Sequence, residues 1–271
     1  MTPRSLVILG SGYTGRILLP QTAQHYRFVY CTSREPERHL AHVPRERRLL
    51  FDLAKPETWQ NIPANADLLW CFPATPLDLV RQCTEAVNAA SRKLVVLGST
   101  SAYDVGCSQE YPPNWIDETA PIDLSKARVQ GEEYLRKACQ AIILRVAGIY
   151  GPGRNPLDWI RTGRVTASRK FVNLIHVEDL AGICLAAIEH GKPGEIYNVS
   201  DGTPRAWKEI CTIAKERWNV LPRPGQEPDA TGKRIETNKL RRDLGIRIHH
   251  ANLFDELEWL DQRQATNEAT P

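Results

Sequence analysis

Short apolar runs recur along the first 150 residues, and segments of helical spacing separate several of them. The strand-like runs are Leu6–Leu9, Arg27–Thr32, Leu49–Leu53, Asp67–Phe72, Lys93–Gly98 and Ala141–Val146. Apolar positions three and four residues apart predict helices at Thr14–Gln24, Leu77–Ala90 and Leu124–Cys139. Strands that alternate with helices at this rhythm predict an α/β fold with a doubly wound parallel sheet. Right-handed crossovers then place the carboxyl ends of all strands along one edge of the sheet.

A glycine loop follows the first strand and opens the first helix. Its residues are Gly10, Ser11, Gly12, Tyr13, Thr14 and Gly15. In this context Gly10 allows a tight turn, Gly12 lets the backbone approach a pyrophosphate, and Gly15 lets the helix pack close to the strand. The helix start then offers free N–H groups to the anion. The loop predicts a Rossmann-type dinucleotide site, and a glycine-rich turn without a ligand is the alternative.

The second strand ends in Ser33 and Arg34, where an NAD-binding fold usually has an acid that holds the ribose 2′-hydroxyl. Because a guanidinium grips a phosphate with two hydrogen bonds, this pair favours NADP as cofactor, with NAD as the second choice. An arginine in a polar surface loop is the alternative interpretation of Arg34. Neither interpretation involves a metal.

Two further strand ends contribute candidate cofactor contacts. Asp52 and Leu53 close the third strand, and the Asp52 carboxylate can accept a hydrogen bond from an adenine amino group or cap the following turn. Pro73 and Ala74 end the fourth strand, where the cofactor is expected to pass.

Hydroxyl groups follow the fifth strand directly, in the segment Ser99–Tyr103. They are expected to face the reactive end of the dinucleotide, where Ser99 or Ser101 can polarise a carbonyl group and Tyr103 can reach a substrate. Serine and threonine are also ordinary turn and cap residues, and Tyr103 can be a packed ring. Residues 104–121 lack periodicity and predict a long loop over the site.

Composition and charge exclude several classes of protein. The net charge of +3 is too small for a nucleic-acid partner, and no apolar run is long enough for a membrane span. The seven cysteines are scattered without a C-x-x-C pair, which indicates reduced core thiols in a cytoplasmic protein. His249 and His250 show no spacing typical of a metal site.

These segments resemble, in their order along residues 6–246, the extended short-chain dehydrogenase/reductases of the NAD-dependent epimerase/dehydratase type. The motifs that carry the resemblance are the glycine loop, Ser99–Tyr103, Asp117-Glu118 before Pro121, Tyr150–Gly153, Phe171–Ala181, Ile196–Val199, and Asn238–Leu240 before Leu244-Gly245. One departure is the spacing of Gly10 and Gly12, which are two residues apart where the family has three.

The resemblance implies a Rossmann core, a small C-terminal substrate domain and, often, a homodimer joined through core helices. Residues 1–150 form the expected core, its sheet completed by about 171–199, where Phe171–Ile175 and Glu195–Val199 are strand-like. Residues 151–170 and 200–263 form the expected substrate-binding part. The polar residues 264–271 predict a disordered tail.

The family's catalytic Tyr-x-x-x-Lys pair is missing from this chain. With the helix aligned on Glu132, Leu124 occupies the tyrosine position and Arg128 the lysine position, and none of the eight tyrosines has a lysine four residues later. Leu124 cannot transfer a proton. Arg128 stays protonated, so it can hold a ribose or phosphate oxygen but cannot act as a base. The pattern resembles an atypical subgroup of the superfamily.

Two hypotheses follow. The first is an NAD(P)-binding oxidoreductase or epimerase-like enzyme that prefers NADP and acts on a small polar or sugar-nucleotide-like substrate. It uses Ser99, Ser101, Tyr103 and Arg128 at the reactive end. Candidate anion anchors on the substrate side are Arg154, Arg169 and Arg234, which can equally be solvated surface charges. The second hypothesis is a non-catalytic redox sensor or interaction module. His176 titrates in the right range for proton transfer but is expected to begin a helix.

Overall fold

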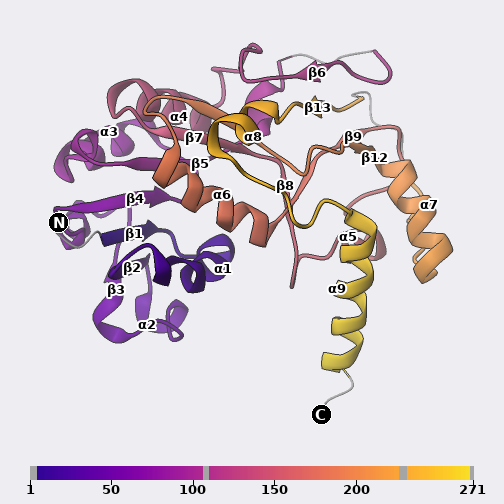
Figure 1. Cartoon of the computed structure of the whole chain (residues 1–271), viewed down its shortest axis with the longest axis horizontal. Coiled ribbons are helices and arrows are strands. Elements are labelled where there is room, and N and C mark those ends of the chain that lie inside the picture. Colours follow the sequence, from indigo (N-terminus) through magenta and orange to yellow (C-terminus); the bar gives the residue numbers. More distant parts are fainter. Residues whose placement is uncertain (1–4, 106–109, 226–230, 269–271) are drawn as a thin grey trace.

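A seven-stranded parallel sheet forms the centre of the computed structural model, which describes residues 5–105, 110–225 and 231–268 (Figure 1). Its strands are β1 (Ser5–Leu9), β2 (Phe28–Ser33), β3 (Arg48–Leu50), β4 (Ala66–Trp70), β5 (Leu94–Ser99), β7 (Ile142–Val146) and β11 (Ile196–Val199). The order is β11-β7-β5-β4-β1-β2-β3, so the direction of strand addition reverses between β1 and β4. This order confirms the prediction of a Rossmann-type, doubly wound sheet.

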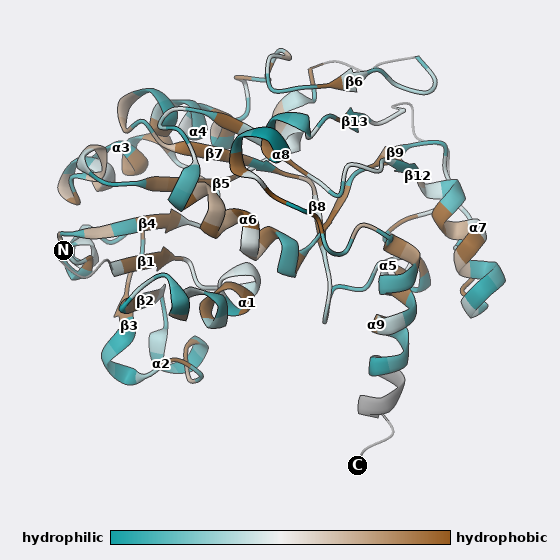
Figure 2. Ribbon diagram, in the orientation of Figure 1, coloured by the Kyte–Doolittle hydropathy of each residue, from teal (hydrophilic) through white to brown (hydrophobic). Residues whose placement is uncertain are grey.

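Helices cover both faces of the sheet. The side chains of α1 (Tyr13–Gln21), α6 (Val177–His190) and α8 (Asn238–Leu244) pack with one face, and those of α3 (Leu77–Ala86) and α4 (Ala127–Ala138) pack with the other. The strands between these layers are apolar along their length, and β1, β4 and β5 stand out as brown arrows in Figure 2. Leu6 to Leu9 are almost fully buried, as expected for a parallel strand covered on both faces.

A smaller cluster of elements lies beyond the carboxyl edge of the sheet. It contains α5 (Pro156–Arg161), α7 (Trp207–Trp218) and α9 (Leu253–Glu268), which share buried side chains including Leu157, Trp207 and Leu257. Short strand pairs connect this part to the core. They are β8 (Gly148–Tyr150) with β10 (Leu174–His176), β9 (Phe171–Val172) with β12 (Arg205–Ala206), and β6 (Trp115–Ile116) with β13 (Arg234–Ile235).

The segment Phe171–Ile175 does not complete the main sheet, which corrects the prediction for residues 171–199; of the two expected strands only Glu195–Val199 joins it, as β11. Asn173 interrupts the segment. Its side-chain amide donates to the Lys233 carbonyl oxygen at 2.8 Å and accepts from the Ile235 N–H at 2.9 Å. The segment is therefore tied to the chain around residue 235 and forms local pairs.

The predicted disordered tail is wrong for residues 264–268, because α9 continues to Glu268. Buried leucines at positions 253, 257 and 260 anchor the helix at helical spacing, and helix formation propagates from that anchored turn. Residues 269–271 lie outside the described residues. A short helix, α2 (Pro36–His39), follows β2 and borders the site. In the part of the chain described, no helix is both long and apolar enough to cross a bilayer.

Candidate functional site

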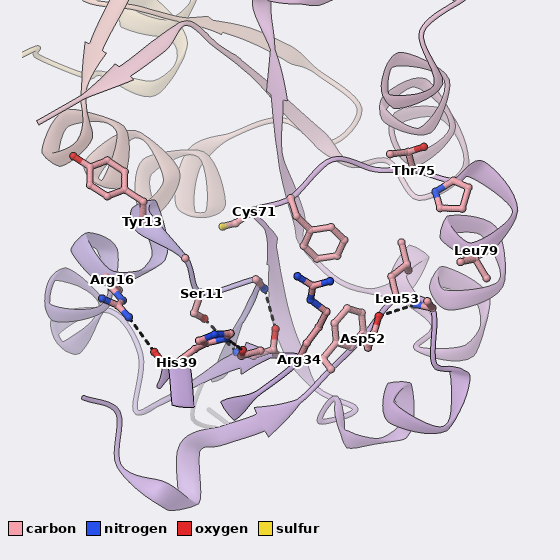
Figure 3. Close-up of a pocket in the computed structure, with 18 of the residues that line it drawn as sticks. Ser11, Tyr13, Arg16, Arg34, His39, Asp52, Leu53, Cys71, Thr75 and Leu79 are labelled. Atoms are coloured by element: carbon pink, nitrogen blue, oxygen red, sulfur yellow. Dashed lines mark hydrogen bonds between the residues drawn. The ribbon is translucent and has the colours of Figure 1, made fainter. Parts of the chain in front are cut away.

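A cavity of about 890 Å³ opens at the carboxyl edge of the sheet, at the point where the strand order reverses (Figure 3). Loops after β1, β2, β3 and β4 form its walls. The lining residues that the sequence analysis singled out are Gly10, Ser11, Gly12, Tyr13, Ser33, Arg34, Asp52, Leu53 and Arg154. Ligands of open α/β sheets bind at such a switch point, so this is the expected place for a nucleotide.

The three glycines of the loop after β1 have three different surroundings. Gly10 has φ of +81°, and a Cβ there would stand 2.8 Å from Cδ1 of Phe72. A Cβ on Gly15 would stand 3.2 Å from Cγ2 of Ile8, so α1 lies close against β1. A Cβ on Gly12 would meet no atom within 4 Å. This is the arrangement that a tight turn, close helix packing and open access for a phosphate require.

The start of α1 leaves hydrogen-bond donors free for an anion. The first bond of the helix runs from the Arg16 N–H to the Gly12 carbonyl oxygen at 3.0 Å, and no side chain caps Gly12. The N–H groups of Tyr13, Thr14 and Gly15 precede that bond and have no partner within the helix. The Gly10 N–H donates to Oγ1 of Thr32 at 2.9 Å, which fixes the loop against β2.

Four polar side chains surround the cavity beyond β2. Ser33 and Arg34 were predicted to bind a 2′-phosphate, and both line the cavity. Arg16 and His39 line it as well and were not predicted. Nδ1 of His39 lies 3.0 Å from Oγ of Ser33, and Nη2 of Arg16 donates to the His39 carbonyl oxygen at 3.2 Å. These contacts join α1 to α2 across 23 residues, a distance that no local motif reveals.

Of the remaining predicted cofactor contacts, some lie in the wall of the cavity and one is buried in the protein core. Asp52 lines the cavity, but one of its carboxylate oxygens already accepts the Ala54 N–H at 3.0 Å, which is the capping role named as the alternative. Leu53 is part of the wall. Ala74 is buried and lines neither cavity of the described structure, because it lies beneath α4 with its carbonyl oxygen against Gly131.

A smaller cavity of about 280 Å³ adjoins the first and reaches toward β5 and β7. The two cavities share the wall residues Gly10, Gly12, Tyr13, Cys71, Phe72 and Arg154. Beyond this shared wall the smaller cavity is lined by predicted residues Thr14, Pro73, Ser99 and Arg128, together with apolar side chains such as Leu97 and Val146. Its polar side chains therefore include those of Thr14, Ser99, Arg128 and Arg154.

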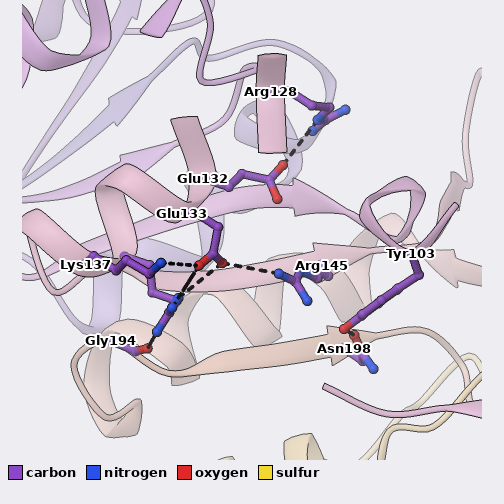
Figure 4. Close-up of polar contacts among 9 residues, drawn as sticks. Tyr103, Arg128, Glu132, Glu133, Lys137, Arg145, Gly194 and Asn198 are labelled. Carbon is purple, nitrogen blue, oxygen red and sulfur yellow. Dashed lines mark hydrogen bonds and ion pairs between the residues drawn. The ribbon is translucent and has the colours of Figure 1, made fainter. Parts of the chain in front are cut away.

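Arg128 is held in place by a buried carboxylate. Its Nε lies 3.2 Å from Oε1 of Glu132, one turn further along α4 (Figure 4). Glu132 is 1% exposed, and its Oε2 has no hydrogen-bond partner among the described residues. Burial raises the pKa of Glu132, and Arg128 opposes that rise. The carboxylate approaches β5 so closely that a Cβ on Gly98 would stand 2.8 Å from Oε2. The i, i+4 spacing was the only sequence signal for this pair.

The hydroxyl-bearing segment after β5 brings one of its three candidates to the cavity. Ser99 lines the smaller cavity, its Oγ accepts the Ser101 N–H at 3.1 Å, and no described residue accepts the Ser99 hydroxyl proton. Ser101 and Tyr103 line neither described cavity. Tyr103 is buried, donates to Oδ1 of Asn198 at 2.7 Å (Figure 4), and has its pKa raised by burial. It is the packed ring named as the alternative.

Two lysines hold the segment after Ser99, and neither was predicted. Nζ of Lys126 donates to the Ser101 carbonyl oxygen at 2.7 Å and to Asp104 at 2.9 Å. Nζ of Lys233 donates to the Thr100 carbonyl oxygen at 2.9 Å and also pairs with Asp104. Burial lowers the pKa of Lys233, while Asp104 opposes that change. We call these contacts the Asp104 clamp.

The three predicted anion anchors each stack on an aromatic ring. Arg154 lies over Tyr13, with 4.1 Å between Cζ and the ring centroid. Arg169 lies 3.9 Å over Tyr111, and Arg234 lies 5.0 Å over Trp115. Of these three arginines, only Arg154 lines a described cavity, and it lines both cavities. A substrate-binding role for Arg169 and Arg234 stays a prediction.

His176 begins α6, as expected, and its Nδ1 accepts the Glu178 N–H at 3.4 Å. Burial lowers the pKa of His176 to about 4. Its ring stacks on His250 at 4.0 Å with an interplanar angle of 27°, and Glu256 lies close to both. Because the two imidazole planes are nearly parallel, their nitrogen lone pairs do not converge on one point. The arrangement favours a structural stack over a metal site.

Comparison with known sequences gives partial matches. No protein-family model matches the chain. A segment of 121 residues is 39% identical to protein YeeZ of Escherichia coli K12, and it spans 40% of this chain and 40% of YeeZ. A longer alignment of 259 residues, 26% identical, covers 83% of this chain and 76% of 4-hydroxy-2-methyl-3-oxo-4-farnesyl-3,4-dihydroquinoline-1-oxide ketoreductase of Stigmatella aurantiaca. The chain thus spans about two fifths of the length of YeeZ.

Solved structures resemble the chain over nearly all its length. A putative NAD-dependent epimerase/dehydratase from Methylobacillus flagellatus has a TM-score of 0.76 at 24% identity, with 98% of this chain and 100% of that chain covered. A short-chain dehydrogenase/reductase superfamily protein from Agrobacterium tumefaciens, solved with bound NAD, has a TM-score of 0.78 at 14% identity and the same coverage.

Two further structures with this fold were also solved with bound ligands. RMD from Pseudomonas aeruginosa, complexed with NADPH, has a TM-score of 0.68 at 14% identity and covers 96% of this chain and 98% of its own. MoeE5 in complex with UDP-glucuronic acid and NAD has a TM-score of 0.72 at 16% identity and covers 96% of this chain and 99% of its own. At these identities the likeness is one of fold, and it confirms the fold that the sequence motifs predicted.

Proposed function

We propose that this chain, which has the fold of the short-chain dehydrogenase/reductase and NAD-dependent epimerase/dehydratase proteins, is an NAD(P)-dependent oxidoreductase or epimerase-like enzyme that prefers NADP. Its substrate is a small polar or sugar-nucleotide-like molecule. One observation carries the proposal: two adjoining cavities meet at the glycine loop, on the carboxyl edge of the sheet where the strand order reverses. A dinucleotide is likewise made of two parts, because a pyrophosphate joins its two nucleoside halves.

The larger cavity suits the adenosine half, because Ser33 and Arg34 border it beyond β2. The smaller cavity suits the nicotinamide half and the reacting group of a substrate. The cofactor would supply hydride transfer there. The chain itself would supply the Ser99 hydroxyl, whose free proton can bond to a carbonyl oxygen, and Arg128, whose guanidinium can hold a ribose oxygen.

Removing the Arg34 guanidinium is expected to weaken the binding of NADPH but not that of NADH. Arg34→Ala should raise the Kd for NADPH about tenfold or more and leave the Kd for NADH nearly unchanged, because only NADPH carries the 2′-phosphate that a charged hydrogen bond would hold. Titration calorimetry of purified protein with each cofactor measures both constants directly.

Arg38→Ala is the matched control. Arg38 is an exposed arginine four residues further along, paired with Glu35 at 3.3 Å, and it does not line the cavity. It should leave both constants unchanged. If Arg34→Ala loses the same affinity for NADPH and NADH, Arg34 does not bind the 2′-phosphate. If the wild-type protein binds neither cofactor, the proposed cofactor is wrong.

A second candidate function is a non-catalytic NAD(P)-binding sensor. The observation that favours it is the site of the missing tyrosine: Leu124 is 55% exposed and carries no proton donor, and Arg128 is paired with Glu132. A sensor of this kind would bind NAD(P) but would not catalyse a reaction.

The double substitution Leu124→Tyr with Arg128→Lys tests which version holds. If the chain is a sensor, turnover of carbonyl or sugar-nucleotide substrates should appear only in the double variant, since a tyrosine acidified by a neighbouring cation restores the proton carrier. If the natural protein is an enzyme, the wild type should either oxidise NADPH with at least one carbonyl substrate or convert a sugar nucleotide with no net change of the cofactor. Change of NADPH absorbance with time is the readout for the first reaction and chromatography of the product for the second, and Leu124→Phe with Arg128→Lys is the control without a hydroxyl.

A further inference from the structure

Arg154 is presented to the cavity by a tight turn. The Gly151 N–H donates to the Arg154 carbonyl oxygen at 3.3 Å, and the Arg154 N–H donates to the Gly151 carbonyl oxygen at 2.9 Å. Gly151 and Gly153 have φ of +142° and +74°, which glycine adopts without strain. A Cβ on Gly151 would also stand 2.9 Å from the Tyr13 hydroxyl. The sequence therefore builds a turn that packs directly against the glycine loop.

The guanidinium of Arg154 lies over the ring of Tyr13, the residue that begins α1. Figure 3 shows Tyr13 at the end of the loop that forms the cavity wall. A planar guanidinium stacks well on an aromatic face while its N–H edges stay available. Tyr13 thus holds the guanidinium at the wall that the two cavities share.

The charge of Arg154 is not neutralised within the described chain. Its side chain is exposed, and no carboxylate of the described residues lies within the 4.0 Å of an ion pair. The start of α1 adds about half a positive charge to the same wall. The wall shared by the two cavities therefore carries positive charge from two sources, and the side chains of Cys71 and Phe72 in that wall are uncharged.

We infer that Arg154 binds the cofactor's pyrophosphate together with the N-terminus of α1. The inference rests on the proposed function, and it assigns to the cofactor a residue expected on the substrate side. A dinucleotide that places one half in each cavity must pass its pyrophosphate along the shared wall, and Arg154 is the only arginine among the described residues that line both cavities. A substrate anchor would line the smaller cavity alone.

Cofactor fragments test the assignment. Arg154→Ala should raise the Kd for NADH, NADPH and ADP-ribose by a similar factor, about tenfold to a hundredfold, because all three contain the pyrophosphate. It should not change the Kd for 2′-AMP, which lacks one. Arg34→Ala should show the opposite pattern, losing affinity for 2′-AMP and NADPH alone. Arg154→Lys, which keeps the charge without the planar stack, should recover part of the loss.

Arg263→Ala is the matched control, since Arg263 is exposed and stacks on Trp259 at 4.4 Å, yet it lines neither cavity. It should change none of the four constants. If Arg154→Ala binds ADP-ribose as tightly as the wild type does, Arg154 does not bind the pyrophosphate, and the proposed function still stands. Failure of the wild-type protein to bind any of the four ligands would overturn both. A melting curve of each variant separates lost contacts from lost folding.

Discussion

Side chains placed on Gly12 are expected to abolish cofactor binding in steps while the fold stays intact. Gly12→Ala should raise the Kd for NADPH about tenfold, and Gly12→Val about a hundredfold or more, which is roughly 2.7 kcal/mol of binding free energy. The reason is geometric. A Cβ on Gly12 meets no protein atom within 4 Å, so it would project into the open space that a pyrophosphate needs. Titration calorimetry gives the constants.

The same variants should melt within about 2 °C of the wild type, since a surface substitution that touches nothing changes stability by about 0.5 kcal/mol or less. Gly182→Val is the matched control: Gly182 lies on α6, also has no atom within 4 Å of its Cβ position, and lines neither cavity. It should bind NADPH normally. Normal binding by Gly12→Val would show that no phosphate passes the loop.

Alanine at Gly131 is expected to destabilise the fold itself. Its Cβ would stand 1.8 Å from the carbonyl oxygen of Ala74, a backbone atom that cannot rotate away. We expect a packing penalty of about 3 kcal/mol or more, of which the better helix propensity of alanine recovers about 1 kcal/mol. The melting temperature should fall by roughly 4–8 °C in differential scanning fluorimetry.

A second glycine-to-alanine substitution in a helix interior supplies the comparison. Gly182→Ala on α6 meets nothing, so it should stabilise the protein by about 0.5–1 kcal/mol through helix propensity alone. Opposite shifts of the two variants would locate the penalty in the contact between α4 and the segment after β4. A melting temperature of Gly131→Ala equal to that of wild type would mean that this contact is looser than the structure has it.

Most of the sheet could be predicted because its strands are continuous apolar runs buried on both faces, as in β1 and β5. The exception was Phe171–Ile175, an apolar segment that forms strands outside the main sheet. Asn173 redirects that segment by hydrogen bonds to a part of the chain 60 residues away. A pairing of that kind depends on tertiary contact, which hydrophobic periodicity does not contain.

The candidate site divides in the same way. The glycine loop, Arg34 and Arg128 could be found because each has a fixed offset from a strand end or from a helix motif. Arg16, His39 and Lys233 could not, since their places depend on side chains that reach across 20 to 130 residues. Tyr103 shows that position alone is not enough. It follows β5, as a residue of the site would, but its hydroxyl points into the core and donates to Asn198.

The Asp104 clamp has a consequence for the order in which the chain can assemble. Asp104 and Thr100 reach their partner Lys233 only after about 130 further residues have been made. During synthesis, domains form from the N-terminus as the chain emerges. Every residue that lines the two cavities lies within the first 154 residues, whereas the segment after Ser99 is tied to Lys233, in the last seventh of the chain. The contacts that fix that segment can therefore form only after all residues of the cavity walls have been made.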